Sequence, residues 1–469
     1  MKTSLPTPRR LALLAAPLLL AGCASLSGNG GIAPVQDAAR TYLGATLLPA
    51  ASEQDLDTID GRVAELLGKP LDADSVVQIA LLNNRGLQAS LQELGIAEAE
   101  MVQASRLPNP GFSFARLRRA DEREIERGFS FDLAHLVALP LTRQVEGRRF
   151  AAVQRSVAME MLSLAAETRK AFYAAVAAEQ TASYMRDVRA TADAGAELAK
   201  RLAEAGNWTR LQQAREHGFF SEAVLNVARA DAARVATRER LTRLLGLWGP
   251  QTAFSLPARL PDLPAEPQDR PDIERAAMAS RLDVQAAKAQ VEATAGNLGL
   301  SKATRFVNVL ELGYQRNGSN EAPRKTGYEI GFEIPLFDWG DARIARAEGL
   351  YMQRVHRAAK TAVDARSEVR EAYQGYRSAY DIARHYRDDI VPTAKRISDE
   401  NVLRYNGMFI SVFELLADAR AQIAAVNASI EALRDFWVAR ADLDMALVGK
   451  PVLGGGAAAA VAGAAAVAH

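Results

Sequence analysis

The sequence has 469 residues, with 57 basic and 56 acidic side chains and a formal net charge of +1. This balance gives no electrostatic footprint for nucleic acid, so nucleic acid is excluded as an expected partner. The chain has one cysteine, Cys23, and therefore no internal disulfide.

Residues 1–22 have the pattern of a lipoprotein signal peptide. A basic start precedes an apolar run, 11–20, that is too short to span a bilayer as a mature helix. The run ends in Leu-Ala-Gly before Cys23, which resembles a bacterial lipobox. The resemblance implies that Cys23 is diacylated, with palmitate among its chains, and that Ala24 in the next position favours delivery to the outer membrane. We expect no cofactor apart from this covalent lipid.

Residues 23–71 carry scattered glycines and prolines and are predicted to form an extended, lipidated N-terminal arm. The segment 72–105 is predicted to be one helix, because its apolar residues recur at helical spacing and an aspartate at its start can cap it. The prolines at 108 and 110 then end this helix.

Two regions alternate between apolar and small or polar residues with a period of two. The first includes Phe112, Phe114 and Phe129 and is expected to run to Pro140. The second includes Leu310, Leu312 and Tyr314 and continues with Tyr328 to Ile334. Such strands fit lipid on one side and water on the other, which places Glu329 and Glu333 on the water side. The charged stretches 118–127 and 316–326 are predicted to be solvated loops, and contact of their basic residues with anionic lipopolysaccharide is the alternative.

Two very long helical hairpins follow the strands. Each arm is nearly free of proline and glycine, and helices of this length need a packing partner. Pro392 should kink the arm that contains it. The predicted helices are 143–205, 209–245, 342–405 and 411–448.

The chain is a duplication. Pro140 and Pro335 are 195 residues apart, Gly206 and Gly407 are 201 apart, and Gly246 and Gly449 are 203 apart, each within a similar local sequence. The predicted organisation is a signal peptide (1–22), the arm (23–71), a first repeat (72–249), a Pro-rich connector (250–271), a second repeat (272–450) and a low-complexity tail (451–469).

Four strands per chain cannot close a barrel, because about eight are needed to surround even a filled core. An open sheet edge is not tolerated in hydrocarbon. Several chains must therefore share one barrel. The predicted fold is mainly α with a small membrane β-barrel sector, in which a strand-strand-long-helical-hairpin unit is duplicated and several chains build one α/β barrel tube, which the family resemblance described next implies is trimeric.

The chain resembles the TolC-like outer-membrane efflux proteins, in their lipid-anchored branch. The resemblance rests on the order and spacing of motifs across 72–450, namely Glu333 to Gly340 with Ala342-Arg343, Ile390-Val391-Pro392, Tyr405-Asn406-Gly407, and Ser280-Arg281-Leu282-Asp283. It implies a homotrimer with a twelve-stranded barrel in the outer membrane of a Gram-negative bacterium and a large periplasmic part. It implies passive conduction of substrates from an inner-membrane efflux pump and a periplasmic adaptor, and no enzymatic activity.

The two hairpin turns are the sharpest candidate sites. A glycine that takes the left-handed conformation explains each turn structurally. The family resemblance adds adaptor docking, and an aromatic residue exposed at each turn would suit a partner. The candidate docking residues are Gly206, Asn207, Trp208, Thr209, Gly407, Met408, Phe409 and Ser411.

Glu414 and Asp418 lie one helical turn apart beyond the second turn. In a threefold ring they would form acidic collars that gate the tunnel, although the second acid of the family pattern falls on Ala417. A solvated helix face is the alternative. The five histidines show no metal-ligand spacing, so no metal site is expected. Two other functions stay open from the sequence, a type I protein secretion duct and a non-pore periplasmic coiled-coil scaffold.

Overall fold

The computed structural model describes residues 25–119, 121–269, 271–305, 309–334 and 336–451. Cys23, the signal segment, Pro335 and the tail beyond Pro451 lie outside the described residues. Backbone contacts divide the chain into two units. Within the described residues, the sheet unit contains 25–35, 91–157 and 283–362, and the hairpin unit contains the remainder.

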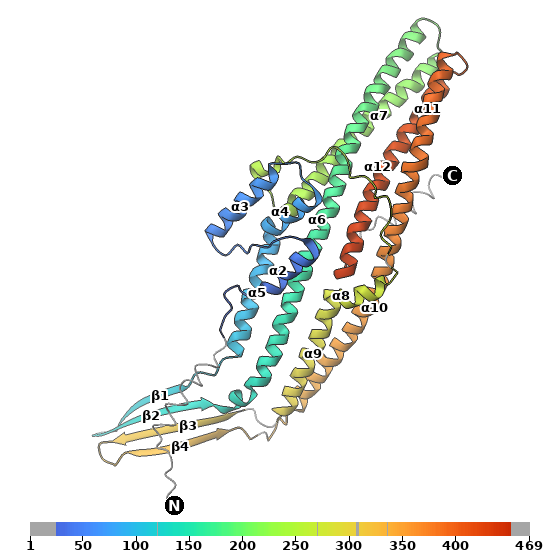
Figure 1. The fold of residues 1–469 in the computed structure, drawn as a ribbon. Helices are drawn as coiled ribbons and strands as arrows, with labels where there is room; N and C mark the ends of the chain where they lie inside the picture. The colour runs from blue at the N-terminus through green and yellow to red at the C-terminus, as the bar shows by residue number, and fades with distance from the viewer. Residues whose placement is uncertain (1–24, 120, 270, 306–308, 335, 452–469) are drawn as a thin grey trace, which may run out of the picture. The chain divides into compact units, whose positions relative to one another are not determined.

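The sheet unit holds one antiparallel sheet of four strands in the order β1-β2-β3-β4 (Figure 1). The strands are β1 (Gly111–Arg119), β2 (Glu122–Asp132), β3 (Leu310–Ser319) and β4 (Lys325–Phe332). The first repeat gives β1 and β2 and the second gives β3 and β4, so the central β2–β3 pair joins the two repeats. The predicted period of two is confirmed in all four strands.

Most of the two charged stretches is strand and not the predicted loop. Residues up to 119 and from 122 are paired strand residues, and β3 likewise continues to Ser319, so that only 320–324 of the second stretch lies between strands. The reason is that most of the charged residues also alternate with a period of two; in β2, Arg123 and Arg127 lie on one face and the glutamates on the other. Charge density alone therefore predicted loops where the backbone continues as strand.

The first β region ends earlier than predicted. Helix α6 (Leu133–Glu204) begins directly after β2 and contains Pro140. The Asp132 carboxylate accepts the backbone N–H of His135 at 2.9 Å, which is how a side chain caps a helix start. This cap was hidden in the sequence by the alternation around it.

Helices occupy the rest of the chain. α5 (Arg85–Ala104), α6, α9 (Leu282–Ala303) and α10 (Asp341–His385) contribute residues to both units. The hairpin unit also contains α3 (Glu53–Leu67), α4 (Ala73–Asn83), α7 (Arg210–Leu245), α8 (Ile273–Ser280), α11 (Val391–Asn406) and α12 (Val412–Val448). None of the helices in the described part of the chain is both long enough and apolar enough to cross a membrane.

The N-terminal arm is not extended throughout, as the sequence suggested. It contains α2 (Ala33–Ala38), a π-helical turn η1 (Ala39–Leu43) and α3. Ser52 and Asp55 form a reciprocal capping box that starts α3. The serine followed three residues later by an acid is the signal that could have predicted this helix.

The predicted helix 72–105 is two helices, broken at Asn84. The side-chain amide of Asn83 donates to the carbonyls of Leu245 (3.1 Å) and Gly246 (2.8 Å), and that of Asn84 donates to Leu244 (2.9 Å). These bonds satisfy carbonyls that the end of α7 leaves without helical partners. The break therefore caps the end of the first hairpin.

The second repeat has an equivalent helix break, in which other residues cap the end of the hairpin. Helices α8 and α9 are separated at Arg281, whose guanidinium donates to the carbonyl of Ala446 at 3.1 Å. The Ser280 hydroxyl donates to the carbonyl of Leu447 at 2.8 Å. Both carbonyls belong to the last turn of α12. The Ser280-Arg281 pair thus caps the second hairpin.

Pro392 interrupts the second hairpin at the predicted place. Helix α10 ends at His385, and a π-helical turn η3 (Tyr386–Ile390) leads into α11 with the proline at its second position. A proline lacks the N–H that would continue the α-helical ladder, and the wider turn absorbs this gap.

The Pro-rich connector packs against the hairpin helices. Phe254 and Leu260 are buried with Phe172 of α6 and Leu245 of α7 in one apolar core. The Tyr380 hydroxyl donates to the carbonyl of Ala265 at 2.7 Å. A second core forms around Tyr376, Tyr380 and Phe436. The connector therefore seals the helices of both repeats within the hairpin unit.

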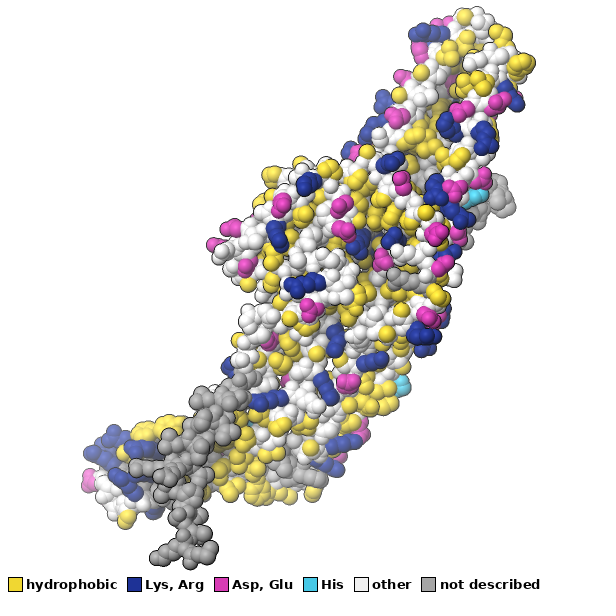
Figure 2. All heavy atoms as spheres, in the orientation of Figure 1, with side chains coloured by type: hydrophobic (Ala, Val, Ile, Leu, Met, Phe, Trp, Pro, Cys, Tyr) yellow, Lys and Arg dark blue, Asp and Glu magenta, His cyan; other side chains and the backbone are white. Residues whose placement is uncertain are grey.

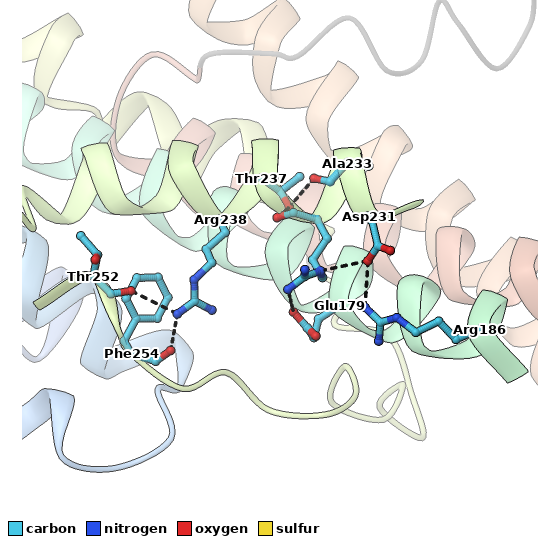
Figure 3. A network of polar contacts seen from close by, with 9 residues as sticks. Glu179, Arg186, Asp231, Ala233, Thr237, Arg238, Thr252 and Phe254 are labelled. Atoms are coloured by element: carbon cyan, nitrogen blue, oxygen red, sulfur yellow. Dashed lines mark hydrogen bonds and ion pairs between the residues drawn. The ribbon is translucent and has the colours of Figure 1, made fainter. Parts of the chain in front are cut away.

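Polar contacts tie α7 to α6 and to the connector (Figure 3). Arg186 of α6 donates to Asp231 of α7 at 2.8 Å, and this bond is the main cause that lowers the pKa of Asp231 below its ordinary value. Arg238 of α7 donates to the carbonyls of Thr252 (3.2 Å) and Phe254, and its guanidinium lies 4.1 Å from the centre of the Phe254 ring. These contacts hold the first hairpin in register.

Candidate functional site

The first hairpin turn is a Schellman motif. Gly206 has φ of +76°, its N–H bonds to the carbonyl of Ala203 (3.1 Å), and the N–H of Asn207 bonds to that of Leu202 (2.9 Å). Thr209 then starts α7 in a capping box with Gln212. The left-handed conformation predicted for Gly206 is confirmed.

The second turn has the same motif, but its left-handed residue is not the predicted glycine. Gly407 has φ of −83°, and Met408 takes φ of +62°. The N–H of Met408 bonds to Tyr405 (2.9 Å) and the N–H of Phe409 bonds to Arg404 (2.9 Å). Gly206 is therefore equivalent to Met408, one residue away from the match that the sequence motif suggested.

Gly407 is needed for a different reason. A Cβ atom at this position would lie 2.8 Å from two ring carbons of Phe409, so the ring rests against the glycine backbone. Met408 and Phe409 are 93% and 84% exposed. Two large apolar side chains thus project from the turn, and the left-handed backbone of Met408 is strained for a residue other than glycine. Exposed apolar side chains on a strained backbone are expected of a binding surface.

The other turn lacks this exposed aromatic residue. Trp208 was predicted to be exposed, but it is only partly exposed. It lies directly before Thr209, where the capping box pulls the chain into α7. The prediction of an exposed aromatic residue at each turn is therefore wrong for the first turn. The exposed apolar surface of the two turns is concentrated at 408–409.

The two turns differ in conformational strain, which gives a first testable expectation. Nothing lies within 4 Å of a Cβ placed on Gly206, so Gly206→Ala should cost only its left-handed conformation, about 1–2 kcal/mol. Met408→Gly should relieve the same strain and, after the extra chain entropy of glycine, stabilise by about 0.5–1 kcal/mol. Thermal unfolding of the two variants should move in opposite directions. Equal shifts would contradict the assigned equivalence.

The proposed gate residues both have local partners. Glu414 closes the capping box of α12 by accepting the N–H of Ser411 at 3.2 Å. Asp418 accepts a hydrogen bond from the side-chain amide of Asn401 on α11. These contacts give both acids a structural role within one chain. An acidic collar formed by several chains around a tunnel stays a prediction.

An ion pair with a buried carboxylate joins the two hairpins near these acids. Glu216 of α7 is 2% exposed and accepts from Arg420 of α12 at 3.0 Å. The Arg420 guanidinium also lies 4.3 Å from the centre of the Phe219 ring. Sequence reasoning missed this contact, because the pair joins residues 204 positions apart in the chain.

The sheet has one apolar face, and that face is exposed. Strand register places the following residues together on it: Phe112, Phe114, Phe129, Phe131, Leu310, Leu312, Tyr314, Tyr328, Ile330 and Phe332. Tyr328, Ile330 and Phe332 are 83%, 65% and 65% exposed. Exposed apolar area on this scale marks a surface that meets another apolar phase.

The opposite face of the sheet is mostly small or polar, with Leu117 as a large apolar exception. It carries glycines and serines together with Glu122, Glu124, Glu126, Glu311 and Glu329. The carboxylate of Glu329 accepts a hydrogen bond from the side-chain amide of Gln315 on the neighbouring strand. The sheet therefore separates an apolar side from a water-compatible, acidic side. Among the described residues, no group of three or more His, Cys, Asp or Glu side chains is placed to hold a metal ion.

This fold, a small sheet with one exposed apolar face and long helical hairpins, is also found in solved structures of outer-membrane proteins. The chain matches the CmeC outer membrane channel of Campylobacter jejuni with a TM-score of 0.70 at 16% identity, covering 80% of this chain and 85% of that one. It matches the outer membrane protein VceC of Vibrio cholerae with a TM-score of 0.68 at 14% identity, covering 85% and 99%. The chain has the fold of these outer-membrane proteins. The predicted resemblance in fold and the mainly helical fold class with a small sheet are confirmed, and the lipid-anchored branch stays a prediction.

Sequence comparison adds a particular relative. The cobalt-zinc-cadmium resistance protein CzcC of Cupriavidus metallidurans is 24% identical over 275 residues, which is 57% of this chain. The match spans 63% of the length of CzcC. No family model matches the sequence.

Proposed function

We propose that this chain is one of three subunits of an outer-membrane channel that serves as the exit duct of a tripartite efflux system. One observation carries the proposal: a four-stranded sheet with one exposed apolar face and two edges unpaired within the described chain. Unpaired edges are not stable in hydrocarbon, so the outer strands β1 and β4 would pair with neighbouring copies. Three copies of four strands give twelve, enough to enclose an aqueous channel.

The proposal places the protein in the outer membrane, with the apolar face of the sheet against lipid and the acidic face toward the lumen. The lipid anchor on Cys23 belongs to the proposal and rests on the lipobox resemblance. A non-pore scaffold would leave the exposed Phe, Tyr and Ile side chains of the sheet without a function. Transport would be passive, with the energy supplied by an inner-membrane pump.

Purified protein in a planar bilayer should form open, ohmic channels that favour cations. The preference follows from the glutamates on the lumen side, which raise the local concentration of cations. Glu311→Gln together with Glu329→Gln should reduce the cation preference without closing the channel. Glu100→Gln, an exposed acid of α5 outside the sheet, is the matched control. Absence of any conductance from trimers would contradict the proposed function.

A cation-favouring duct is consistent with the relative that is named for cobalt, zinc and cadmium resistance. We therefore propose divalent metal ions as the first cargo to test. A duct needs no tight metal site, since a passive pathway must release what it admits. A strain lacking the gene should lose tolerance to these ions and regain it with the wild-type gene.

The second hairpin turn is the proposed docking surface for the periplasmic adaptor. Phe409→Ser should weaken adaptor binding about tenfold or more, because an exposed aromatic residue is a typical interface anchor. Val235→Ser, which also removes an exposed apolar side chain of the hairpin unit, should leave binding unchanged. Co-purification of the adaptor measures the effect, and bilayer conductance checks that the channel is intact. Equal binding by both variants would remove the docking assignment.

A further inference from the structure

The apolar face of the sheet ends in a cluster of arginines. Register pairs Arg127 of β2 directly with Arg316 of β3, and Arg118 of β1 with Arg123 of β2. Arg116 lies between these pairs, opposite Ile125. Side-chain alternation puts all five arginines on the face that carries the phenylalanines and tyrosines. Figure 2 shows basic side chains gathered at the end of the sheet that holds its two turns.

This arrangement favours the binding of an anion. Like charges placed directly opposite each other destabilise an antiparallel pair. The glutamates of the sheet cannot neutralise them, because register places Glu122, Glu124, Glu126, Glu311 and Glu329 on the other face. Among the described residues, none forms an ion pair with Arg116, Arg127 or Arg316. These three arginines therefore carry positive charge that no acidic side chain of the described residues pairs with.

Three of these arginines, Arg123, Arg127 and Arg316, line a hollow of about 350 Å³ together with Arg324 from the turn before β4. The rest of its lining consists of Ile125, Asn317, Gly318, Ser319 and Asn320. Gly318 forms part of the hollow, and the aliphatic stem of Arg324 would lie 3.7 Å from a Cβ at this glycine. Several guanidinium groups around one hollow can hold phosphate oxygens in pairs.

The order of side chains along the same face identifies the ligand. Ile330, Leu312 and Phe131 form one cross-strand row, and the aromatic row of Tyr328, Tyr314, Phe129 and Phe112 follows it. The Tyr314 and Tyr328 ring centres are 5.6 Å apart, and those of Phe112 and Phe129 are 5.0 Å apart. The Arg127–Arg316 pair comes next, about 7 Å further along the strands. Hydrocarbon, interface and headgroup regions of a bilayer occur in the same order.

We propose that this arginine cluster binds the phosphate groups of a phosphorylated membrane lipid whose acyl chains lie on the aromatic and aliphatic rows of the sheet. The inference rests on the proposed function, because it requires the apolar face to be in the bilayer. Asp121 and the turn at 320–324 would then lie at the headgroup level. The side-chain amide of Asn320 donates to the carbonyl of Asp121 at 3.0 Å and holds the two turns together there.

Diphosphorylated lipid A and the full-length trimer are the probes. Native mass spectrometry of the detergent-extracted protein should show lipid A bound to the wild type. Arg316→Gln should weaken this binding about tenfold or more, since charge-assisted hydrogen bonds are lost. Arg316→Lys should restore part of it. Lys325→Gln is the matched control, because it removes one positive charge from the opposite face of the same sheet.

The possible results distinguish a lipid phosphate from a free anion, and the lipid site from the channel function. Dephosphorylated lipid A that binds as tightly as the phosphorylated form would overturn the site, as would an equal loss in Lys325→Gln. Inorganic phosphate that displaces lipid A at equal concentration would assign the cluster to a free anion and overturn the lipid. Conductance of the same samples tests the channel independently, and normal channels without phosphate-dependent lipid binding would reject only the lipid site.

Discussion

Ile330→Lys should prevent assembly of the protein in the outer membrane, whereas Glu329→Lys should not. Ile330 lies on the exposed apolar face of β4 and is 65% exposed in the isolated chain. A lysine on the lipid side of a barrel strand costs about 2–4 kcal/mol near the bilayer midplane, and each of three copies would carry that cost. Glu329 is the next residue and faces the lumen side. The two substitutions introduce the same side chain one position apart.

Membrane fractionation and native gel electrophoresis measure this result. The Ile330→Lys chain should be lost from the trimer band or be degraded, and the Glu329→Lys chain should remain trimeric with a reduced cation preference. The account of the sheet fails if both variants assemble equally. It also fails if Glu329→Lys is the more damaging of the two, because the faces would then be reversed.

Arg281→Leu should be among the most destabilising single substitutions in the hairpin unit. Arg281 is 1% exposed, pairs with Glu368 at 2.7 Å and donates to the carbonyl of Ala446. Its removal leaves a carboxylate that is largely buried and the end of α12 without a cap. Removing one partner of a buried pair costs about 3–5 kcal/mol.

Arg370→Leu is the matched control for this prediction. Arg370 lies on the same helix as Glu368 and pairs with Glu274 at 3.4 Å, but the two side chains are 59% and 43% exposed. Such a surface pair contributes about 0–1 kcal/mol. Denaturant unfolding followed by circular dichroism should separate the two variants clearly. Similar losses of unfolding free energy in both variants would show that the buried Arg281 pair does not stabilise the second repeat more than a surface pair does.

Patterns set by one residue and its near neighbours could be predicted from the sequence. Alternation with a period of two predicted the strands, and the Gly206 turn followed from the preference of glycine for positive φ. The strands around 118–127 were missed because charge suggested solvent. The charge alternation within β2 was the available signal, because it places the arginines of that strand on one face and its glutamates on the other.

Features that depend on distant contacts could not be predicted. At the helix breaks, Asn84 and Arg281 donate hydrogen bonds that cap hairpin ends 160 and 165 residues further along the chain. The left-handed residue of the second turn is Met408 because Gly407 is used for the close approach of the Phe409 ring. Both choices follow from packing, which local preference does not report.

Disulfide cross-linking between β1 and β4 of different copies tests the central claim most directly, that one chain supplies a third of a channel wall. Cysteine at Ala115 in β1 should be combined in turn with cysteine at Gly327, Glu329 or Gly331 in β4. At least one combination should yield covalent dimers and trimers, with no larger species, on a denaturing gel. Chains that stay monomeric in every combination, yet conduct ions in a planar bilayer, would contradict the account.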